Sequence, residues 1–191
     1  MKTDARYTKS DAAIRQTFLE ILAHKDFHKI SVQEIIQTAD INRSTFYAHF
    51  LDKDDLMETI QRDLLDDTIG TLPDAAIDAL TESAIFEHRV SYLIERLYKN
   101  RELTSLLLSP HAEHSFENRL VERAKEEFFN TTEGRPLAIP AKYALTILTG
   151  TVTNMIITWI RSDYEESTAE FTHILIQVVP PLLNKVLRAA N

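Results

Sequence analysis

The stretch that decides the fold reads ISVQEIIQTADINRSTFYAHFLDKDDL and spans residues 30–56. Ser31 and Glu34 have the spacing of a capping box, in which a serine hydroxyl and a glutamate three residues later satisfy the free backbone N–H groups of a helix start. This pattern predicts that a short helix begins at Ser31. The helix is expected to run to about Ala39.

A tight turn is predicted directly after this helix. Asp40 and Asn42 both tolerate turn conformations, and Asn42 can also cap a second short helix over residues 43–49. Two short helices joined in this way form a helix-turn-helix, which brings the second helix to the DNA major groove while the first lies across the backbone. The sequence therefore predicts a small nucleic-acid-binding domain.

The two faces of this motif differ in chemistry. Its apolar residues are expected to form a small core: Val32, Ile35, Ile36, Ala39, Ile41, Phe46 and Phe50. The outward residues are Gln33, Gln37, Arg43, Ser44, Thr45, Tyr47 and His49. None of these outward side chains is acidic, so the face is compatible with binding phosphates.

The rest of the chain carries helical periodicity and almost no strand pattern. In addition to the two short helices, helices are predicted over residues 10–25, 52–70, 83–100, 102–108, 115–130, 141–162 and 167–189. Thr8 and Asp11 can cap the first of them. Pro180 and Pro181 lie inside the last and predict a kink or break there, because each removes a backbone donor. The expected fold is all-α, with about nine helices.

Two domains are expected, with the boundary in a connection near Pro73. Residues 1–70 would form the DNA-binding domain with its connecting fourth helix, and residues 71–191 a dimerisation and sensing domain. Residues 1–53 hold eight Lys or Arg against seven Asp or Glu, whereas the remaining 138 residues hold 13 against 22. The net charge of −8 therefore does not describe the N-terminal part, whose first nine residues have the composition of a short basic arm.

Composition also restricts the cellular setting. The absence of cysteine excludes disulfides, Cys-based zinc sites and Cys nucleophiles. The N-terminus is polar and lacks the apolar stretch of a signal peptide. The most apolar segment, Ala144 to Ile160, is interrupted by four threonines, a glycine and an asparagine within its central part, which argues against a membrane span. A cytoplasmic protein without a cofactor is expected.

The run from Ile30 to Leu56 resembles the DNA-binding domain of the tetracycline-repressor (TetR) family, most strongly in STFYAHFLDKDDL. The resemblance covers roughly the first third of the chain, and the remainder is similar only in length and helical layout. It implies a homeodomain-like three-helix domain followed by a helical dimerisation and sensing domain. One departure is Asp40, at a turn position that is commonly glycine in the family; Asp adopts the left-handed conformation more readily than most residues.

The resemblance implies a role for each DNA-facing residue. Arg43, Ser44 and Thr45 would face base edges, with Arg43 suited to guanine and the Thr45 methyl to thymine. Tyr47 and His49 would bond phosphates, and Lys53 would add charge at the start of the fourth helix. Gln33 and Arg6 complete the predicted set. The alternatives are that Arg43 pairs with Asp40, that Tyr47 covers apolar surface and that His49 is a solvated helix-end residue.

In relatives the last two long helices pack against their copies in a second chain, which would set the spacing of two operator half-sites. The candidate interface residues are Ile147, Thr151, Met155, Phe171, Leu175 and Val178, together with Trp159. Aromatic residues that could line an apolar effector pocket are Tyr92, Tyr98, Phe116, Phe128, Phe129, Tyr143 and Trp159. Core packing is the alternative for both sets. The effector could be a small molecule or a protein.

Other classes of function are less compatible with the sequence. Three glycines cannot build a Walker loop or a dinucleotide fingerprint, and no GxSxG elbow occurs, so no enzyme is expected. His111 and His114 follow Pro110 in a predicted loop and lack an HExxH arrangement, so solvated side chains are expected rather than metal ligands. The remaining alternative is an interaction module of the same fold that has lost DNA binding. The resemblance favours a DNA-binding repressor.

Overall fold

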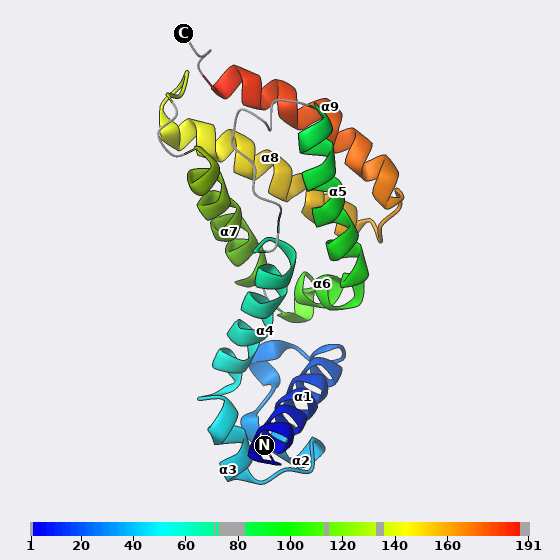
Figure 1. Ribbon diagram of the computed structural model, residues 1–191. Coiled ribbons are helices and arrows are strands. Elements are labelled where there is room, and N and C mark those ends of the chain that lie inside the picture. Colours follow the sequence, from blue (N-terminus) through cyan, green and yellow to red (C-terminus); the bar gives the residue numbers. More distant parts are fainter. Residues whose placement is uncertain (1, 71, 73–82, 113–114, 133–135, 188–191) are drawn as a thin grey trace. The chain divides into compact units, whose positions relative to one another are not determined.

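The computed structural model describes residues 2–70, 72, 83–112, 115–132 and 136–187 (Figure 1). Over these residues it contains nine α-helices: α1 Lys2–Leu22, α2 Val32–Thr38, α3 Arg43–His49, α4 Lys53–Thr68, α5 Ser83–Lys99, α6 Arg101–Leu107, α7 Ser115–Thr132, α8 Ala141–Arg161 and α9 Thr168–Val186. The only β-type pairing among them is an isolated bridge between Leu137 and Leu187. The all-α prediction is confirmed.

The chain divides into two compact units. The first contains Met1–Leu64 and Leu106–Phe116, and the second contains Leu65–Ser105 and Glu117–Asn191. The chain therefore passes between the units within α4, within α6 and near the start of α7. The predicted boundary, after residue 70, falls close to the first of these passages, and the connection around Pro73 lies outside the described residues.

In the first unit, α1 packs against both α2 and α3. Its buried residues Ile14, Phe18 and Leu22 lie on the face that the sequence pattern indicated. The start of the helix differs from the prediction, because α1 begins at Lys2 and not near Ser10. The N-terminal basic segment is thus helical rather than a free arm. The prediction that Thr8 and Asp11 cap the start of this helix is wrong, because both lie inside α1.

At the start of α2, one of the two hydrogen bonds of the predicted capping box is present. The Ser31 hydroxyl accepts a hydrogen bond from the Glu34 backbone N–H at 3.2 Å. The Glu34 carboxylate pairs with Lys25 Nζ at 2.8 Å, and this contact lowers the pKa of Glu34. The glutamate therefore ties α2 to the end of the α1 segment.

The turn between α2 and α3 depends on one residue in the left-handed region. Asp40 has φ 49°, in agreement with the expectation that it would take the position of the family's glycine. Asn42 has the extended backbone of an N-cap residue, but its side chain makes no capping hydrogen bond. The backbone shape of the turn, not side-chain capping, thus determines where α3 begins.

The start of α4 is capped by two aspartates. Asp52 Oδ1 accepts from the Asp55 backbone N–H, and Asp55 Oδ2 accepts from the Leu51 backbone N–H, both at 2.8 Å. These bonds satisfy N–H groups that a helix start leaves free. Leu56, Ile60, Leu64 and Leu65 are buried, as predicted, and the helix ends at Thr68, two residues earlier than expected.

Residues 106–116 belong to the first unit and are held there by an ion pair. His111 Nδ1 lies 2.8 Å from Asp26 Oδ1, while Lys29 Nζ lies 2.6 Å from Asp26 Oδ2. Hydrogen bonds from Lys29 and His111 lower the pKa of Asp26 to about 2. His111 is therefore paired with a carboxylate, and His114 lies outside the described residues.

In the second unit, α9 packs against α5 and α8 (Figure 1). The break predicted at Pro180 and Pro181 is wrong, because α9 continues through both prolines to Val186. Leu175, Val179, Pro180, Leu183 and Val186 are all buried along this helix. The burial of this apolar face offsets the two backbone hydrogen bonds that the prolines cannot donate.

The helix α8 is the one described helix that is long and apolar enough to cross a membrane by length and composition. Its residues Ala144, Leu148, Ile156, Trp159 and Ile160 are buried inside the second unit. A core helix passes the same test, so this feature does not indicate a membrane protein.

Replacing Asp40 by glycine should stabilise the protein by about 0.5 kcal/mol, because glycine adopts a positive φ at no steric cost. The same replacement at Asp66, an exposed position inside α4, should destabilise it by a similar amount, about 0.5 kcal/mol, through the low helix propensity of glycine. Urea unfolding of the two variants measures whether the free energy of unfolding changes in opposite directions. Equal destabilisation by both would contradict the importance of the left-handed turn.

Candidate functional site

The outward face of α3 carries the predicted base-contacting residues. Arg43 and Ser44 are exposed, and Thr45 is half-buried at the same end of the helix. Tyr47 is 45% exposed, and the guanidinium carbon of Arg43 lies 5.6 Å from the centre of its ring. No described carboxylate pairs with Arg43, so the alternative pairing with Asp40 does not occur. This face presents a cation, two hydroxyls and a phenol to solvent.

Two further predicted residues lie on other helices. Gln33 is exposed on α2, the helix that packs next to α3. Arg6 lies in α1, but its side chain lies outside the described part of the chain. Arg43, Ser44, Thr45 and Tyr47 are thus brought together on one helix, with Gln33 on its neighbour.

His49 differs from the prediction, because its side chain is only 2% exposed. Its Nε2 lies 2.7 Å from the Ser10 hydroxyl, and its ring contacts the Tyr7 ring at a tilt of 37°, with the ring centres 3.9 Å apart. The Tyr7 hydroxyl donates to the Ala48 carbonyl at 3.3 Å. A phosphate contact and a solvated helix end are both wrong for His49, since α1 covers the imidazole.

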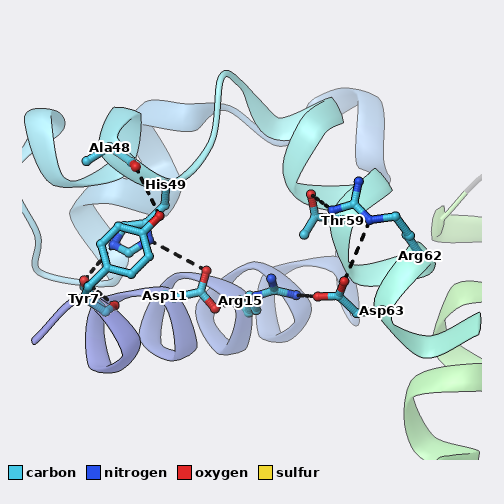
Figure 2. Close-up of polar contacts among 9 residues, drawn as sticks. Tyr7, Asp11, Arg15, Ala48, His49, Thr59, Arg62 and Asp63 are labelled. Carbon is cyan, nitrogen blue, oxygen red and sulfur yellow. Dashed lines mark hydrogen bonds and ion pairs between the residues drawn. The ribbon is translucent and has the colours of Figure 1, made fainter. Parts of the chain in front are cut away.

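His49 begins a chain of polar contacts across three helices (Figure 2). Its Nδ1 lies 3.8 Å from Asp11 Oδ1, and Asp11 Oδ2 accepts from Arg15 Nε at 2.7 Å. Arg15 NH1 also donates to Asp63 of α4 at 2.7 Å. The guanidinium carbon of Arg15 lies 5.6 Å from the centre of the Phe50 ring. Arg15 therefore links α1, the end of α3 and α4.

Lys53 also has a different role from the predicted one. Its Nζ donates to the Phe27 carbonyl at 2.8 Å and lies 4.5 Å from the centre of the Phe27 ring. The ammonium is therefore held inside the first unit and is not simply displayed at the start of α4. It has two N–H donors beyond the one used for Phe27.

Three residues of α1 contact the end of α3, although the sequence pattern did not single them out: Tyr7, Ser10 and Arg15. They recur every three to five residues along α1, and together they fix the end of α3 through His49 and Phe50. A polar residue on a helix face that lies next to an apolar stripe gives no sequence signal of its own. Only the packing of α1 against α3 shows their role.

Most of the aromatic residues that were predicted to line an effector pocket lie away from the cavity observed in the second unit. Of these residues only Phe128 lines the observed cavity. Trp159 is buried in a cluster with Tyr98, Tyr164 and Phe171, and its ring stacks on Phe171 at 4.6 Å. Tyr143 and Phe129 are more than half exposed, Tyr92 is half-buried beside Arg96, and Phe116 is buried in the first unit. The large rings fill core or surface positions instead.

The observed cavity lies within the second unit and has a volume of about 170 Å³. It is lined by residues of α5, α7, α8 and α9, together with Ile69 and Leu72, and it is partly open. Aliphatic side chains make up most of its lining, including Leu93, Leu120 and Val152. An apolar cavity of this kind is typical of small-molecule sites.

The residues predicted to form the dimer interface differ in exposure, because some are at least partly exposed and others are buried in the single chain. Ile147 is exposed on α8, and Thr151, Met155 and Val178 are half-buried on α8 and α9. Phe171 and Leu175 are 4% and 1% exposed within a single chain, so their assignment to the interface is wrong. On α9 the exposed Ile174 lies one helical turn before Val178 and occupies the outer face in their place.

Comparison with known proteins identifies the family. Residues 14–60 match the family of bacterial regulatory proteins named tetR, and residues 86–180 match the C-terminal region of transcriptional regulators of the same type. Together the two matches cover well over half of the chain. The chain belongs to the TetR family of transcriptional regulators. This membership agrees with the expectation that the protein is not an enzyme.

Individual relatives agree with this assignment. YxbF, an HTH-type transcriptional regulator of Bacillus subtilis strain 168, is 38% identical over 61 residues, which cover 31% of this chain and 16% of YxbF. A TetR regulator from Streptococcus agalactiae has a TM-score of 0.71 at 21% identity, covering 94% of this chain and 98% of its own. NalD of Pseudomonas aeruginosa, the secondary repressor of the MexAB-OprM multidrug efflux pump, has a TM-score of 0.61 at 16% identity over 96% and 100%. These structures share the fold.

Replacing His49 by alanine should lower the free energy of unfolding by about 1–3 kcal/mol, because a buried side chain and the partner of Ser10 are lost together. Ser44→Ala on the exposed face of the same helix should change it by less than about 0.5 kcal/mol. Chemical denaturation of both variants makes the comparison. An unchanged stability of His49→Ala would contradict the buried position of the imidazole.

Proposed function

We propose that this chain is a repressor that binds a pseudo-palindromic DNA operator as a homodimer and is released by an effector. The observation that carries the proposal is the outward face of α3, where Arg43, Ser44, Thr45 and Tyr47 are gathered without an acidic side chain. A recognition helix needs such a face, because acidic groups would repel phosphates. The repressor NalD, which has the same fold, is consistent with this direction of control.

The position of each residue suggests its contact with DNA. Arg43 at the N-terminus of α3 can form two hydrogen bonds to a guanine, and the Thr45 methyl can contact a thymine. Tyr47 and Gln33 are exposed on adjacent helices and can bond phosphates, while Lys53 can use its remaining N–H donors in the same way. We include Arg6 because it adds a positive charge to α1. The protein would act in the cytoplasm, where it meets chromosomal DNA.

The proposal is tested by selecting bound fragments from the source genome with purified protein and measuring the affinity of the enriched fragment against salt. One pseudo-palindromic site with a steep salt dependence would support it. Reporter expression from that site, with and without the protein, separates repression from activation. No enrichment at low salt by folded, dimeric protein would favour an interaction module that has lost DNA binding.

Arg43→Ala should weaken binding to the operator by about 1–3 kcal/mol and relax the preference at one base pair, because a bidentate contact to a base edge is lost. Thr45→Ala should relax the preference at a neighbouring base pair and leave the salt dependence unchanged, since no charge is removed. Binding assays against single-base operator variants at two salt concentrations measure both effects. Equal weakening on every sequence would contradict a base contact by either residue.

The proposed dimer uses the outer faces of α8 and α9. Ile147, Met155, Ile174 and Val178 place apolar side chains at the surface, and Gly150 and Thr151 are small enough for close approach of a second chain. Apolar side chains exposed on two adjacent helices lose contact with water when a second chain covers them, which favours association. A twofold axis through this surface would place two α3 helices on half-sites about 34–36 Å apart.

Ile174→Asp should shift the protein from dimer to monomer, because it places a charge in the apolar interface without disturbing the buried core of α9. The matched control is Asn130→Asp, which adds the same charge at an exposed position of α7. Analytical ultracentrifugation distinguishes the species. A dimeric Ile174→Asp variant would show that the interface lies elsewhere.

A further inference from the structure

His49, the last residue of α3, has both of its ring nitrogens close to oxygen atoms of α1 (Figure 2). Its Nε2 lies 2.7 Å from the Ser10 hydroxyl, and its Nδ1 lies 3.8 Å from Asp11 Oδ1. The side chain is only 2% exposed, and Nδ1 has no hydrogen-bond partner in the described part of the chain. A buried polar atom without a partner is costly, so this nitrogen requires an explanation.

The neighbouring serine determines which nitrogen of a neutral His49 carries the proton. The single hydroxyl proton of Ser10 is donated to the Tyr7 carbonyl at 3.0 Å. The Ser10 oxygen therefore accepts from Nε2–H, and Nδ1 of the neutral imidazole has a lone pair and no proton. An ionised carboxylate is also only an acceptor. A neutral His49 thus places two acceptors, its own Nδ1 and Asp11 Oδ1, opposite each other.

A proton on Nδ1 removes this mismatch. The imidazolium has two N–H donors, one for the Ser10 oxygen and one for the Asp11 carboxylate, and its positive charge attracts the carboxylate. The charge also lies at the C-terminal end of α3, where the free backbone carbonyls favour a cation. Shortening the distance of 3.8 Å to that of a hydrogen bond would draw the end of α3 towards α1.

The other charged groups of this network hold Asp11 in place. Arg15 Nε donates to Asp11 Oδ2 at 2.7 Å, and Arg15 NH1 pairs with Asp63 of α4 at 2.7 Å. Arg62 Nε, also on α4, lies 3.9 Å from Asp63 Oδ1. Among the described residues, no charged group of α2 or α4 pairs directly with the imidazole. The carboxylate that faces His49 is therefore the one on α1.

We propose that Asp11 is a positioning residue for α3, which acts by forming an ion pair with the protonated imidazole of His49. The pair holds the end of α3 against α1 in the orientation that binds DNA, so operator binding and proton uptake at Nδ1 favour each other. The ion pair belongs to the free protein, whereas its effect on operator affinity rests on the proposed function. Operator affinity should therefore be higher when His49 is protonated.

The test measures the operator affinity of the full-length protein at constant ionic strength at about pH 6 and about pH 8, because histidine ordinarily changes its charge in this range. The wild type should bind at least about fivefold more tightly at the lower pH, which is the lower end of typical couplings between two sites. Asp11→Asn should reduce this ratio to about twofold or less, because its amide can donate to the Nδ1 lone pair and satisfy the neutral imidazole. A wild-type ratio near one, or an unchanged ratio in Asp11→Asn, would overturn the proposal.

The matched control is Asp63→Asn. It removes the same charge and also takes an ion-pair partner from Arg15, but it leaves the carboxylate beside His49 unchanged. This variant should keep the wild-type ratio, including any contribution from other histidines. An equal loss in both aspartate variants would assign the pH dependence to the contacts of Arg15 and overturn the role of Asp11.

A second variant is used if Asp11→Asn does not fold, as judged by circular dichroism. His49→Gln keeps an N–H donor for Ser10 but cannot become charged, so it should also reduce the ratio of operator affinities to about twofold or less. A wild-type ratio in His49→Gln would place the pH dependence at another residue and overturn the proposal.

Imidazole nitrogen-15 NMR of the free protein separates this proposal from the proposed function. The His49 signals, identified by their loss in His49→Gln, should show a proton only on Nε2 at high pH. The proton on Nδ1 should persist to a higher pH in the wild type than in Asp11→Asn, because a neighbouring negative charge favours the charged imidazole. The opposite tautomer, or the same titration in both proteins, would overturn the proposal. The expected NMR result without operator binding at either pH would refute the proposed function and the effect on DNA, while the ion pair would stand.

Discussion

The geometry of the outward face of α3 depends on the burial of Phe46 and Phe50 between α3 and its neighbours. A helix of seven residues, such as α3, is too short to be stable alone in water. Its exposed end can present Arg43 in a fixed direction only because its other face is anchored. The tilted ring contact of His49 with Tyr7 and the contact of Arg15 with Phe50 extend this anchor from α3 to α1.

The polar contacts of the first unit have a structural role that their chemistry alone would not suggest. His49 and Lys53 carry groups that often bind phosphate, yet each is engaged inside the unit, with Ser10 and with the Phe27 carbonyl. Ser10 satisfies Nε2 of His49, whereas the buried Nδ1 has no hydrogen-bond partner among the described residues, which costs more than a typical hydrogen bond contributes. These residues thus position α3, and the proposed contact with DNA is left mainly to the residues on its outer face.

In the second unit, the cavity lies mainly among aliphatic side chains, and most of the aromatic residues named above lie elsewhere. The aromatic rings of Trp159 and Phe171 stack on each other and fill the core near the turn between α8 and α9. The cavity is left where aliphatic residues and Ala124 meet between four helices, and its single charge is compensated by Arg89. The shape and polarity of this cavity are therefore determined by the space left open and by the ion pair of Glu127 with Arg89.

The sequence by itself determined the local features of this protein. The Ser31 cap of α2, the turn at Asp40 and the order of the helices depend on residues a few positions apart, and these features were predicted correctly, although the start of α1 was not. The tertiary structure alone decided which side chains are covered. His49 lies against Tyr7 and Ser10, about forty residues earlier in the chain, and Phe171 lies against Trp159 across a turn. Periodicity predicts which face of a helix is apolar, but packing between helices decides what that face, and the polar residues beside it, contact.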